Sequence, residues 1–518
     1  MSARGVLAAG HPLTAEAGAR VLREGGNAVD AAVAAVMTSF VTESPLTGLG
    51  AGGFMLVHTR DESVLLDFFI AAPGLDGVER RSELVPIPVY FTEETPQVFN
   101  IGAASCGVPG TPAGLEEALR RFGTVPLAEL AAEPARLARE GVEVNSEQAF
   151  FMAILEPILC HYDEGRAIYA PEGHMLGAGE VFRFPELGDA LERLGAEGSD
   201  PFYRGETAQT ISAWVLERGG ALGVDDLAAY EPIAREPVEA AFRGRDILTN
   251  PPPSSGGVLI AFALDLLERV GATGVEELVG AMEAAQAART LDFLDHLHER
   301  GFVQRFLTGQ HIAVAATAIV ERQRAGHGPT VLGDQLGSTT HITAVDAEGD
   351  CATVTCSNGT GSGLIVPGTG VHVNNMLGEE DLNPHGFHRH VAGRRLPSMM
   401  SPTVVLRDGD LELGLGSGGS NRIRSAILQT VLRVVADGMD VAEAVVAPRV
   451  HFEAGAVQAE PGVDEEALKR LEERGYGVFR WRERNVFFGG VHAVARDPET
   501  GELRGGGDPR RGGAVAVA

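Results

Sequence analysis

A threonine at position 339 stands where the chain could cut itself and expose a nucleophile. Residues 322–337, which precede it, are rich in glycine and polar residues and show no regular periodicity, so they predict an exposed loop. The residues after it begin a β-branched run that is typical of a strand. Cleavage between Ser338 and Thr339 would free an amine beside the Thr339 hydroxyl. An α-amine titrates at about 7.7–8.0, so it could act as general base near neutral pH.

The strand that begins at Thr339 is expected to turn back on itself. Two runs rich in β-branched residues flank residues 347–350, a short segment that contains glycine, and this pattern predicts a β-hairpin. Antiparallel pairing would then place Thr339 near Ser357 and Asn358. Threonine is a good strand former, so the hairpin alone is also compatible with a purely structural role.

Longer motifs surround this hairpin in a fixed order. Upstream they are residues 10–13, 25–32, 48–54, 107–114 and 250–257, and from the hairpin onward they are Thr339-Thr340-His341, residues 366–371 with Asn374-Asn375, Ser401-Pro402-Thr403, residues 418–423 and residues 505–514. Together they resemble the γ-glutamyltransferases (γ-glutamyltranspeptidases, or glutathione hydrolases), which belong to the Ntn hydrolases. The matched motifs run from about residue 5 to the end of the chain.

The resemblance implies both a fold and an activity. The fold would be of the α+β class, a four-layer αββα sandwich made as one precursor and cut into a large subunit, residues 1–338, and a small subunit, residues 339–518. The activity would be that of an amide hydrolase or acyl transferase on γ-glutamyl or related acyl amides. Two alternatives stay open: an acylase of the same mechanism whose substrate lacks an α-carboxylate, and an uncleaved, non-catalytic homologue.

The resemblance assigns the catalytic roles to four residues. Thr339 would be the nucleophile, and Ser357, at a position where the family has threonine, would hydrogen-bond to it. The backbone N–H groups of Gly418 and Gly419 would form the oxyanion hole. Independently of the family, residues 414–420 predict a glycine loop that delivers N–H groups to a helix start.

The resemblance places the arginine that holds the substrate's α-carboxylate, and a pair of adjacent serines, at positions that are changed here. The family's arginine falls on Phe69. Of two adjacent serines, Ser398 remains and the second is Met399. We therefore expect Phe69 and Ser398 to contact substrate and γ-glutamyl compounds to be poor substrates.

The positions around the substrate's amino group are changed as well. The family's asparagine falls on Gly359, with Asn358 beside it and facing the other way unless the strand bulges. The family's glutamine and aspartate fall on Met376 and Glu379, so one position keeps an acid and the other loses its polarity. Asn358, Met376 and Glu379 complete the predicted substrate-binding set.

No cofactor or metal is predicted. Residues 48–53 contain G-x-G-x-x-G, but a helical pattern precedes them and a strand pattern follows, the reverse of a dinucleotide-binding unit. His385, His388 and His390 lie in a Pro/Gly-containing segment without ligand spacing, which favours a loop near the active site over a metal site.

Composition narrows the range of partners. The chain has 518 residues, a net charge of −29 and 44% hydrophobic residues. Such an acidic surface disfavours nucleic acid and anionic membranes but says little about a small substrate. The small-molecule γ-glutamyl or acyl amide partner is implied by the resemblance. The longest apolar runs, residues 31–41 and 258–267, are too short to span a bilayer. The first residues lack the apolar core of a secretory signal, so a cytoplasmic location is expected, with export left open.

Overall fold

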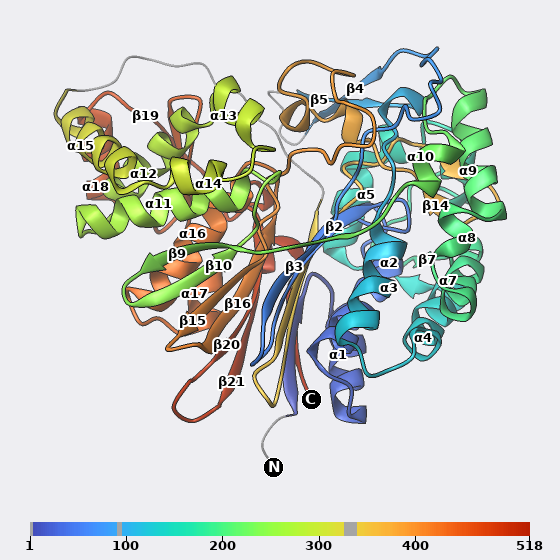
Figure 1. Cartoon of the computed structure of the whole chain (residues 1–518), viewed down its shortest axis with the longest axis horizontal. Helices are drawn as coiled ribbons and strands as arrows, with labels where there is room; N and C mark the ends of the chain where they lie inside the picture. Colours follow the sequence, from blue (N-terminus) through green and yellow to red (C-terminus); the bar gives the residue numbers. More distant parts are fainter. Residues whose placement is uncertain (1–3, 91–95, 326–338) are drawn as a thin grey trace.

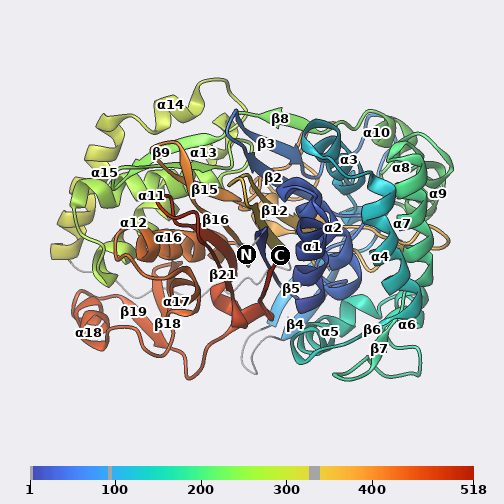
Figure 2. The same ribbon diagram turned by 90° about the horizontal axis from the view of Figure 1, so that it is seen from below.

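Two β-sheets lie face to face, and helices cover the outer side of each (Figure 1). The computed structural model describes residues 4–90, 96–325 and 339–518. Seen from below, the first described residues and the C-terminus lie close together at the centre, where the Arg4 N–H donates to the Ala518 carbonyl, with one group of helices on either side (Figure 2). Within the described residues the architecture is therefore of the mixed α and β class.

The first sheet has seven strands that come from distant parts of the chain. In spatial order they are β22 (Ala514–Val517), β1 (Gly5–Ala9), β11 (Thr340–Asp346), β12 (Cys351–Ser357), β2 (Gly52–His58), β3 (Ser63–Phe68) and β8 (Ile233–Arg235). All neighbouring pairs are antiparallel. The two central strands form the predicted hairpin, with Thr340 opposite Cys356. The hairpin prediction is thus confirmed, and its register brings Thr339 next to Ser357.

The second sheet has six strands and is built mostly from the last quarter of the chain. Its order is β21 (Leu503–Gly507), β20 (Gly490–Arg496), β16 (Asp410–Gly418), β15 (Thr403–Arg407), β10 (Arg245–Thr249) and β9 (Val238–Phe242). The predicted glycine loop at residues 414–420 is therefore wrong in its first part. Residues 414–418 continue β16 because their backbone pairs with β20.

Helices of the first half of the chain cover the first sheet and the space beside it. They are α1 (Pro12–Glu24), α2 (Ala28–Thr42), α3 (Thr111–Phe122), α4 (Leu127–Glu140), α5 (Ser146–Leu159), α6 (Asp163–Tyr169), α7 (Pro185–Glu197), α8 (Asp200–Tyr203), α9 (Glu206–Glu217) and α10 (Val224–Ala228). Helix α2 is buried along its whole length because it packs on β11 and β12. Helix α3 is capped by Gly110, and Thr111 is already helical.

Helices of the second group cover the second sheet. They are α11 (Gly256–Val270), α12 (Val275–Ala288), α13 (Leu291–His296), α14 (Phe302–Phe306), α15 (Gly309–Ala325), α16 (Arg422–Val435), α17 (Val441–Val446) and α18 (Glu465–Glu473). Smaller sheets pair β4 (Val85–Tyr90) with β5 (Pro96–Ile101), β6 (Val142–Glu143) with β7 (Val181–Phe182), β13 (Ile365–Val366) with β14 (Val371–His372), and β17 (Val450–Glu453) with β18 (Ala456–Ala459) and β19 (Gly477–Arg480). Helix α15 runs to Ala325, so residues 322–325, predicted as loop, are helical; residues 326–338 lie outside the described residues.

A polar layer lies between the two facing sheets, directly behind Thr339. His341 is buried, with Nδ1 2.8 Å from the Thr355 hydroxyl and Nε2 3.0 Å from the Thr343 hydroxyl. The Thr343 hydroxyl also donates to the carbonyl oxygen of His492 on the opposite sheet at 3.1 Å. Gly416 makes room for this imidazole, because a Cβ there would overlap the ring. Such a satisfied buried network fixes how the two sheets face each other.

Candidate active site

Thr339 lies just before β11 and is 6% exposed. Its Oγ1 donates a hydrogen bond of 3.3 Å to Oγ of Ser357, and Oγ of Ser357 also accepts from the backbone N–H of Gly359 at 3.0 Å. The structure thus brings together the predicted nucleophile and its predicted hydroxyl partner. Ser338, on the other side of the predicted cleavage point, lies outside the described residues.

Of the two glycines predicted to form an oxyanion hole, Gly418 lies against Thr339. A Cβ on Gly418, the last residue of β16, would overlap the Thr339 carbonyl oxygen. Gly419 has φ of +124°, a conformation that L side chains rarely adopt, and a Cβ there would lie 2.9 Å from Cα of Gly489. Gly418 therefore lets the backbone of Thr339 approach closely, and Gly419 is required by its own backbone conformation.

Arg511 contacts the nucleophile from the far end of the chain. It belongs to η5 (Pro509–Arg511) and donates from Nη1 to the Thr339 carbonyl oxygen at 3.3 Å. Burial lowers the pKa of Arg511 to about 10, so the guanidinium is still charged near neutral pH. The sequence analysis recognised residues 505–514 as a motif but gave Arg511 no role, because nothing in the local pattern places it beside residue 339.

A small cavity of about 50 Å³ opens beside the Thr339 hydroxyl. Its walls include four of the predicted site residues on the substrate side, and its lining is Phe69, Thr339, Ser357, Gly359, Met376, Glu379, Asp381, Leu382, Ser398, Met399, Met400, Ser420 and Ile423. None of these described lining residues is basic. The sequence analysis gave no site role to Asp381, Leu382, Met400, Ser420 and Ile423, although the last two belong to the motif at residues 418–423. We refer to this cavity as the acyl pocket.

Phe69 forms one apolar wall of the acyl pocket. Its ring stacks on that of Phe54, with centroids 5.2 Å apart. The backbone around it is fixed, since its N–H donates to Oδ1 of Asp67 at 3.0 Å and its carbonyl accepts from the Tyr230 hydroxyl at 2.7 Å. Arg235 pairs with the same aspartate at 2.7 Å. The position that holds an arginine in the resembled family is therefore a rigid aromatic surface here.

A second part of the lining is the segment from Ser398 to Met400. Oγ of Ser398 accepts from the backbone N–H of Met400 at 3.1 Å, which orients this hydroxyl. The carbonyl of Ser398 accepts from the backbone N–H of Ser255 at 2.9 Å, and a Cβ on Gly256 would overlap the Met399 carbonyl. The motif at residues 250–257 thus holds this wall of the acyl pocket in place.

The remaining predicted contacts differ in their placement. Asn358 does not line the acyl pocket, because its side chain turns away and donates to the His372 carbonyl at 3.2 Å. Gly359 has φ of +64°, and a Cβ there would overlap the Asn375 side chain, so no asparagine fits at this position. Glu379 does line the pocket. Burial raises its pKa to about 7, and a hydrogen bond with Asn375 only partly offsets that effect.

Two of the three histidines in residues 385–390 contact different groups. His385 Nε2 lies 2.9 Å from Asp295 on α13, while His390 Nε2 lies 3.0 Å from the Leu382 carbonyl. Over the parts of the chain that the structure describes, no group of three or more His, Cys, Asp or Glu side chains could hold a metal ion. In the same parts, no helix is long and apolar enough to cross a membrane.

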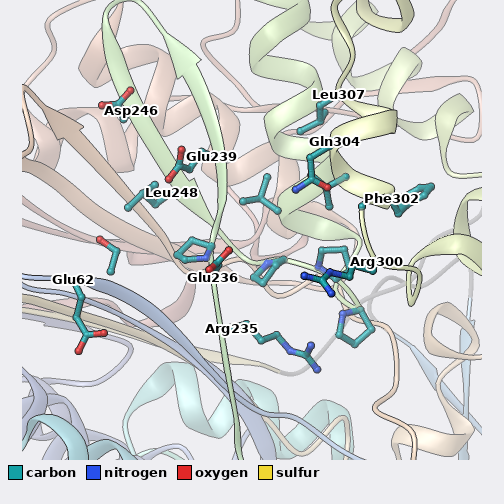
Figure 3. A pocket seen from close by; sticks show the side chains of 18 of the residues that line it. Glu62, Arg235, Glu236, Glu239, Asp246, Leu248, Arg300, Phe302, Gln304 and Leu307 are labelled. Carbon is teal, nitrogen blue, oxygen red and sulfur yellow. The ribbon is translucent and has the colours of Figure 1, made fainter.

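A larger cleft of about 1260 Å³ lies away from Thr339 (Figure 3). Charged side chains of both signs line it, among them Glu62, Arg235, Glu239 and Arg300. It contains none of the predicted site residues that the structure describes. The chemistry indicated by the sequence therefore belongs to the acyl pocket and not to the larger cleft.

Comparisons with known proteins agree with this arrangement over the whole chain. The family model described as gamma-glutamyltranspeptidase matches residues 14–518. A glutathione hydrolase proenzyme of Escherichia coli is 30% identical, covering 98% of this chain and 90% of its own. An acylase ACY 1 proenzyme of a Pseudomonas species is 32% identical, covering 97% and 91%. The similar proteins thus include both glutathione hydrolases and acylases.

Solved structures show the same fold. A cephalosporin acylase from Bacillus halodurans superposes with a TM-score of 0.84 and 25% identity, covering 99% of this chain and 96% of its own. The gamma-glutamyltranspeptidase of Helicobacter pylori gives a TM-score of 0.53 at 29% identity, over 60% of this chain and 90% of its own.

Proposed function

This chain belongs to the gamma-glutamyltranspeptidase family of Ntn hydrolases, and we propose that it is an N-terminal-threonine amide hydrolase or acyl transferase. The observation that carries the proposal is the placement of Thr339, whose hydroxyl meets Ser357 at the wall of the acyl pocket while Gly418 packs against its carbonyl. The names of the relatives, which include proenzymes, support self-processing into residues 1–338 and 339–518. The helices outside the two facing sheets support the four-layer sandwich.

Self-processing begins with the Thr339 hydroxyl. Its oxygen attacks the Ser338 carbonyl, the peptide nitrogen leaves as the new α-amine, and the resulting ester is hydrolysed by water. In catalysis the same oxygen attacks the substrate's amide carbonyl. The freed amine takes the hydroxyl proton and passes it to the leaving amine, and water or an acceptor amine then releases the acyl group. Backbone N–H groups of Gly418 and Gly419 stabilise the oxyanion.

Among acyl amides, the acyl pocket favours groups without an α-carboxylate. Phe69 occupies the position of the family's arginine, which would hold the carboxylate, and of the family's two adjacent serines only Ser398 remains, beside Met399. An unpaired carboxylate in such an enclosed, apolar site costs several kcal/mol. The names of the acylase relatives support the same substrate class.

The arginines near the oxyanion glycines do not replace the missing one. Arg422 is fully buried, lies 3.5 Å from Glu453 and packs over the Phe487 ring at 4.8 Å. Arg424 lines a different cavity, beside His451 and Ser425. Neither is part of the acyl pocket lining, so neither offers a carboxylate partner there.

A γ-glutamyl substrate remains the second candidate. It is favoured by Glu379, an acid in the pocket lining that could face an amino group, and by the glutathione hydrolase relatives. An uncleaved, non-catalytic protein is the third, and a single uncut chain would identify it.

The experiment is a comparison of p-nitroanilide hydrolysis by the purified protein. Butyryl, glutaryl and γ-glutamyl anilides would be measured side by side, with Thr339→Ala as the blank. We expect kcat/KM for the best acyl anilide to exceed that for the γ-glutamyl anilide at least tenfold. A preference for the γ-glutamyl anilide would select the second candidate instead.

A further inference from the structure

The turn that follows the two glycines has an unusual backbone. Between the end of β16 at Gly418 and the start of α16 at Arg422, the chain must reverse while keeping the glycine N–H groups beside Thr339. Ser420 in this turn has φ of +52°, a left-handed conformation that serine rarely adopts. A strained residue persists only where surrounding contacts hold it, so the turn needs an external support.

Asp381 supplies contacts of that kind. Its Oδ2 accepts a hydrogen bond from Oγ of Ser420 at 2.6 Å, and its Oδ1 accepts from Nδ2 of Asn421 at 3.2 Å. Both carboxylate oxygens are thus bonded to the turn, although Asp381 also lines the acyl pocket. A short hydrogen bond to a carboxylate is stronger than one between neutral groups.

Asp381 is itself anchored, and the turn is held from a second side. The guanidinium of Arg289, at the end of α12, donates to the Asp381 carbonyl at 2.8 Å. Glu453 accepts from the same Asn421 amide at 2.7 Å. Burial opposes ionisation of Glu453, but the His451 hydrogen bond and the charges of nearby arginines lower its pKa to about 2. The side-chain amide of Asn421, close to the two glycines, thus donates to both Asp381 and Glu453.

We propose that Asp381 is a positioning residue that holds the Gly418–Gly419 backbone in place for oxyanion stabilisation. The inference rests on the proposed function, since it presumes that these glycines face the reacting carbonyl. Asp381 acts through Ser420 and Asn421, since each of its two carboxylate oxygens accepts a hydrogen bond from one of them. Its loss should therefore lower kcat more than it changes KM.

The test measures kcat and KM per cut chain for Asp381→Ala, Asp381→Asn, Ser420→Ala and the double variant of Asp381→Ala with Ser420→Ala. The substrate is the acyl anilide that the wild type hydrolyses fastest. Glu380→Ala is the matched control, because Glu380 is the exposed residue that directly precedes Asp381 in the chain. Removing one oxyanion donor costs about 100- to 1000-fold in kcat, so displacing the turn should cost roughly 10- to 100-fold.

We expect Asp381→Ala to lose that much kcat with KM within about threefold of wild type. Asp381→Asn should lose less, because its amide oxygen can still accept from Ser420. The kcat of the double variant should be little lower than that of either single variant, since both changes break the same hydrogen bond between Asp381 and Ser420. Circular dichroism of Asp381→Asn guards against a folding defect.

The inference is overturned if Asp381→Ala keeps wild-type kcat, if only KM rises, or if the two losses are additive. Failure of the proposed function would look different. In that case the wild type itself would not hydrolyse any anilide, or Thr339→Ala would remain as active as the wild type.

Discussion

At the scale of single residues, the proposed chemistry and the proposed substrate choice depend on different side chains. Thr339, Ser357, Gly418 and Gly419 could serve any acyl amide, because they act on the amide bond itself. Phe69, by contrast, lines the acyl pocket and places an aromatic ring where the resembled family has an arginine. Substrate choice should therefore change with Phe69 while the chemistry remains.

Replacing Phe69 by arginine should restore part of a carboxylate site. A hydrogen bond to a charged group contributes about 1.5–3 kcal/mol, which corresponds to roughly 10- to 150-fold in kcat/KM. We expect the preference for acyl over γ-glutamyl anilides to narrow by a factor within this range. Phe69→Leu, which stays apolar, is the matched control and should keep the preference. An unchanged ratio in Phe69→Arg would mean that another group recognises the carboxylate.

Glu379 should make binding of cationic acyl groups depend on pH. Its pKa is raised to about 7, so its carboxyl is neutral below that pH and ionised above it. For an acyl anilide that bears an ammonium group, KM should fall by roughly tenfold as the pH rises from 6 to 8. Glu379→Gln should remove this change, and a butyryl anilide should show little of it even in the wild type. A pH-independent KM for the cationic substrate in the wild type would exclude Glu379 from the binding site.

At the scale of elements, Glu43 joins two helices to the strand that follows the nucleophile. It caps the end of α2, and its carboxyl accepts from the Thr340 hydroxyl on β11 at 2.6 Å and from the Thr14 hydroxyl on α1 at 3.2 Å. Burial raises its pKa from 4.5 to about 7, although these hydrogen bonds and the charge of Arg511 oppose the shift. The neutral acid is thus the form that the fold prefers.

Stability should therefore fall as Glu43 ionises. Because the folded pKa is above the unfolded one, the folded state binds more protons between about pH 4.5 and 7, and its free energy of unfolding decreases across that window. The shift corresponds to about 3 kcal/mol in full, of which 2 to 3 kcal/mol falls between pH 5 and 8. Glu43→Gln keeps an acceptor for Thr340 but cannot ionise. Between pH 5 and 8, its free energy of unfolding in urea titrations should therefore fall by about 2 to 3 kcal/mol less than that of the wild type. Glu16→Gln, an exposed acid on α1, is the control; equal losses in both variants would contradict the assignment.

The elements near the site were largely predictable from sequence, whereas the contacts between them were not. The hairpin follows from strand-forming residues around a short turn, and Thr339 and Ser357 meet because antiparallel register is fixed by that turn. Residues 414–418 look like a glycine loop in isolation, yet they pair as a strand with β20. The glycine at position 416 is needed there because the His341 ring packs against it. Glu43, Asp381 and Arg511 reach the site only through long-range packing, which no local pattern encodes.

At the scale of the whole molecule, the proposed subunits are interleaved. In the seven-stranded sheet, β1 of the first segment lies between β22 and β11 of the second, and β12 pairs with β2. In the six-stranded sheet, β10 pairs with β15. Separating residues 1–338 from 339–518 would break these ladders and expose both apolar cores.

The two chains should therefore stay together after cleavage. We expect them to elute as one particle in size-exclusion chromatography without denaturant, and to unfold in a single transition, because each sheet contains strands of both. The Thr339→Ala precursor provides the uncut reference. Elution of the small chain by itself would show that the sheets do not hold the cut halves.

The central claim is that Thr339 becomes the N-terminal nucleophile. Intact mass and N-terminal sequencing of the purified protein test it most directly, with Thr339→Ala and Thr339→Ser in parallel. The account predicts two chains in the wild type, the smaller beginning at Thr339, one uncut inactive chain in Thr339→Ala, and cleavage retained in Thr339→Ser because serine keeps the hydroxyl. A wild-type chain that stays whole yet hydrolyses acyl anilides, or a small chain that begins at Thr340, would contradict it.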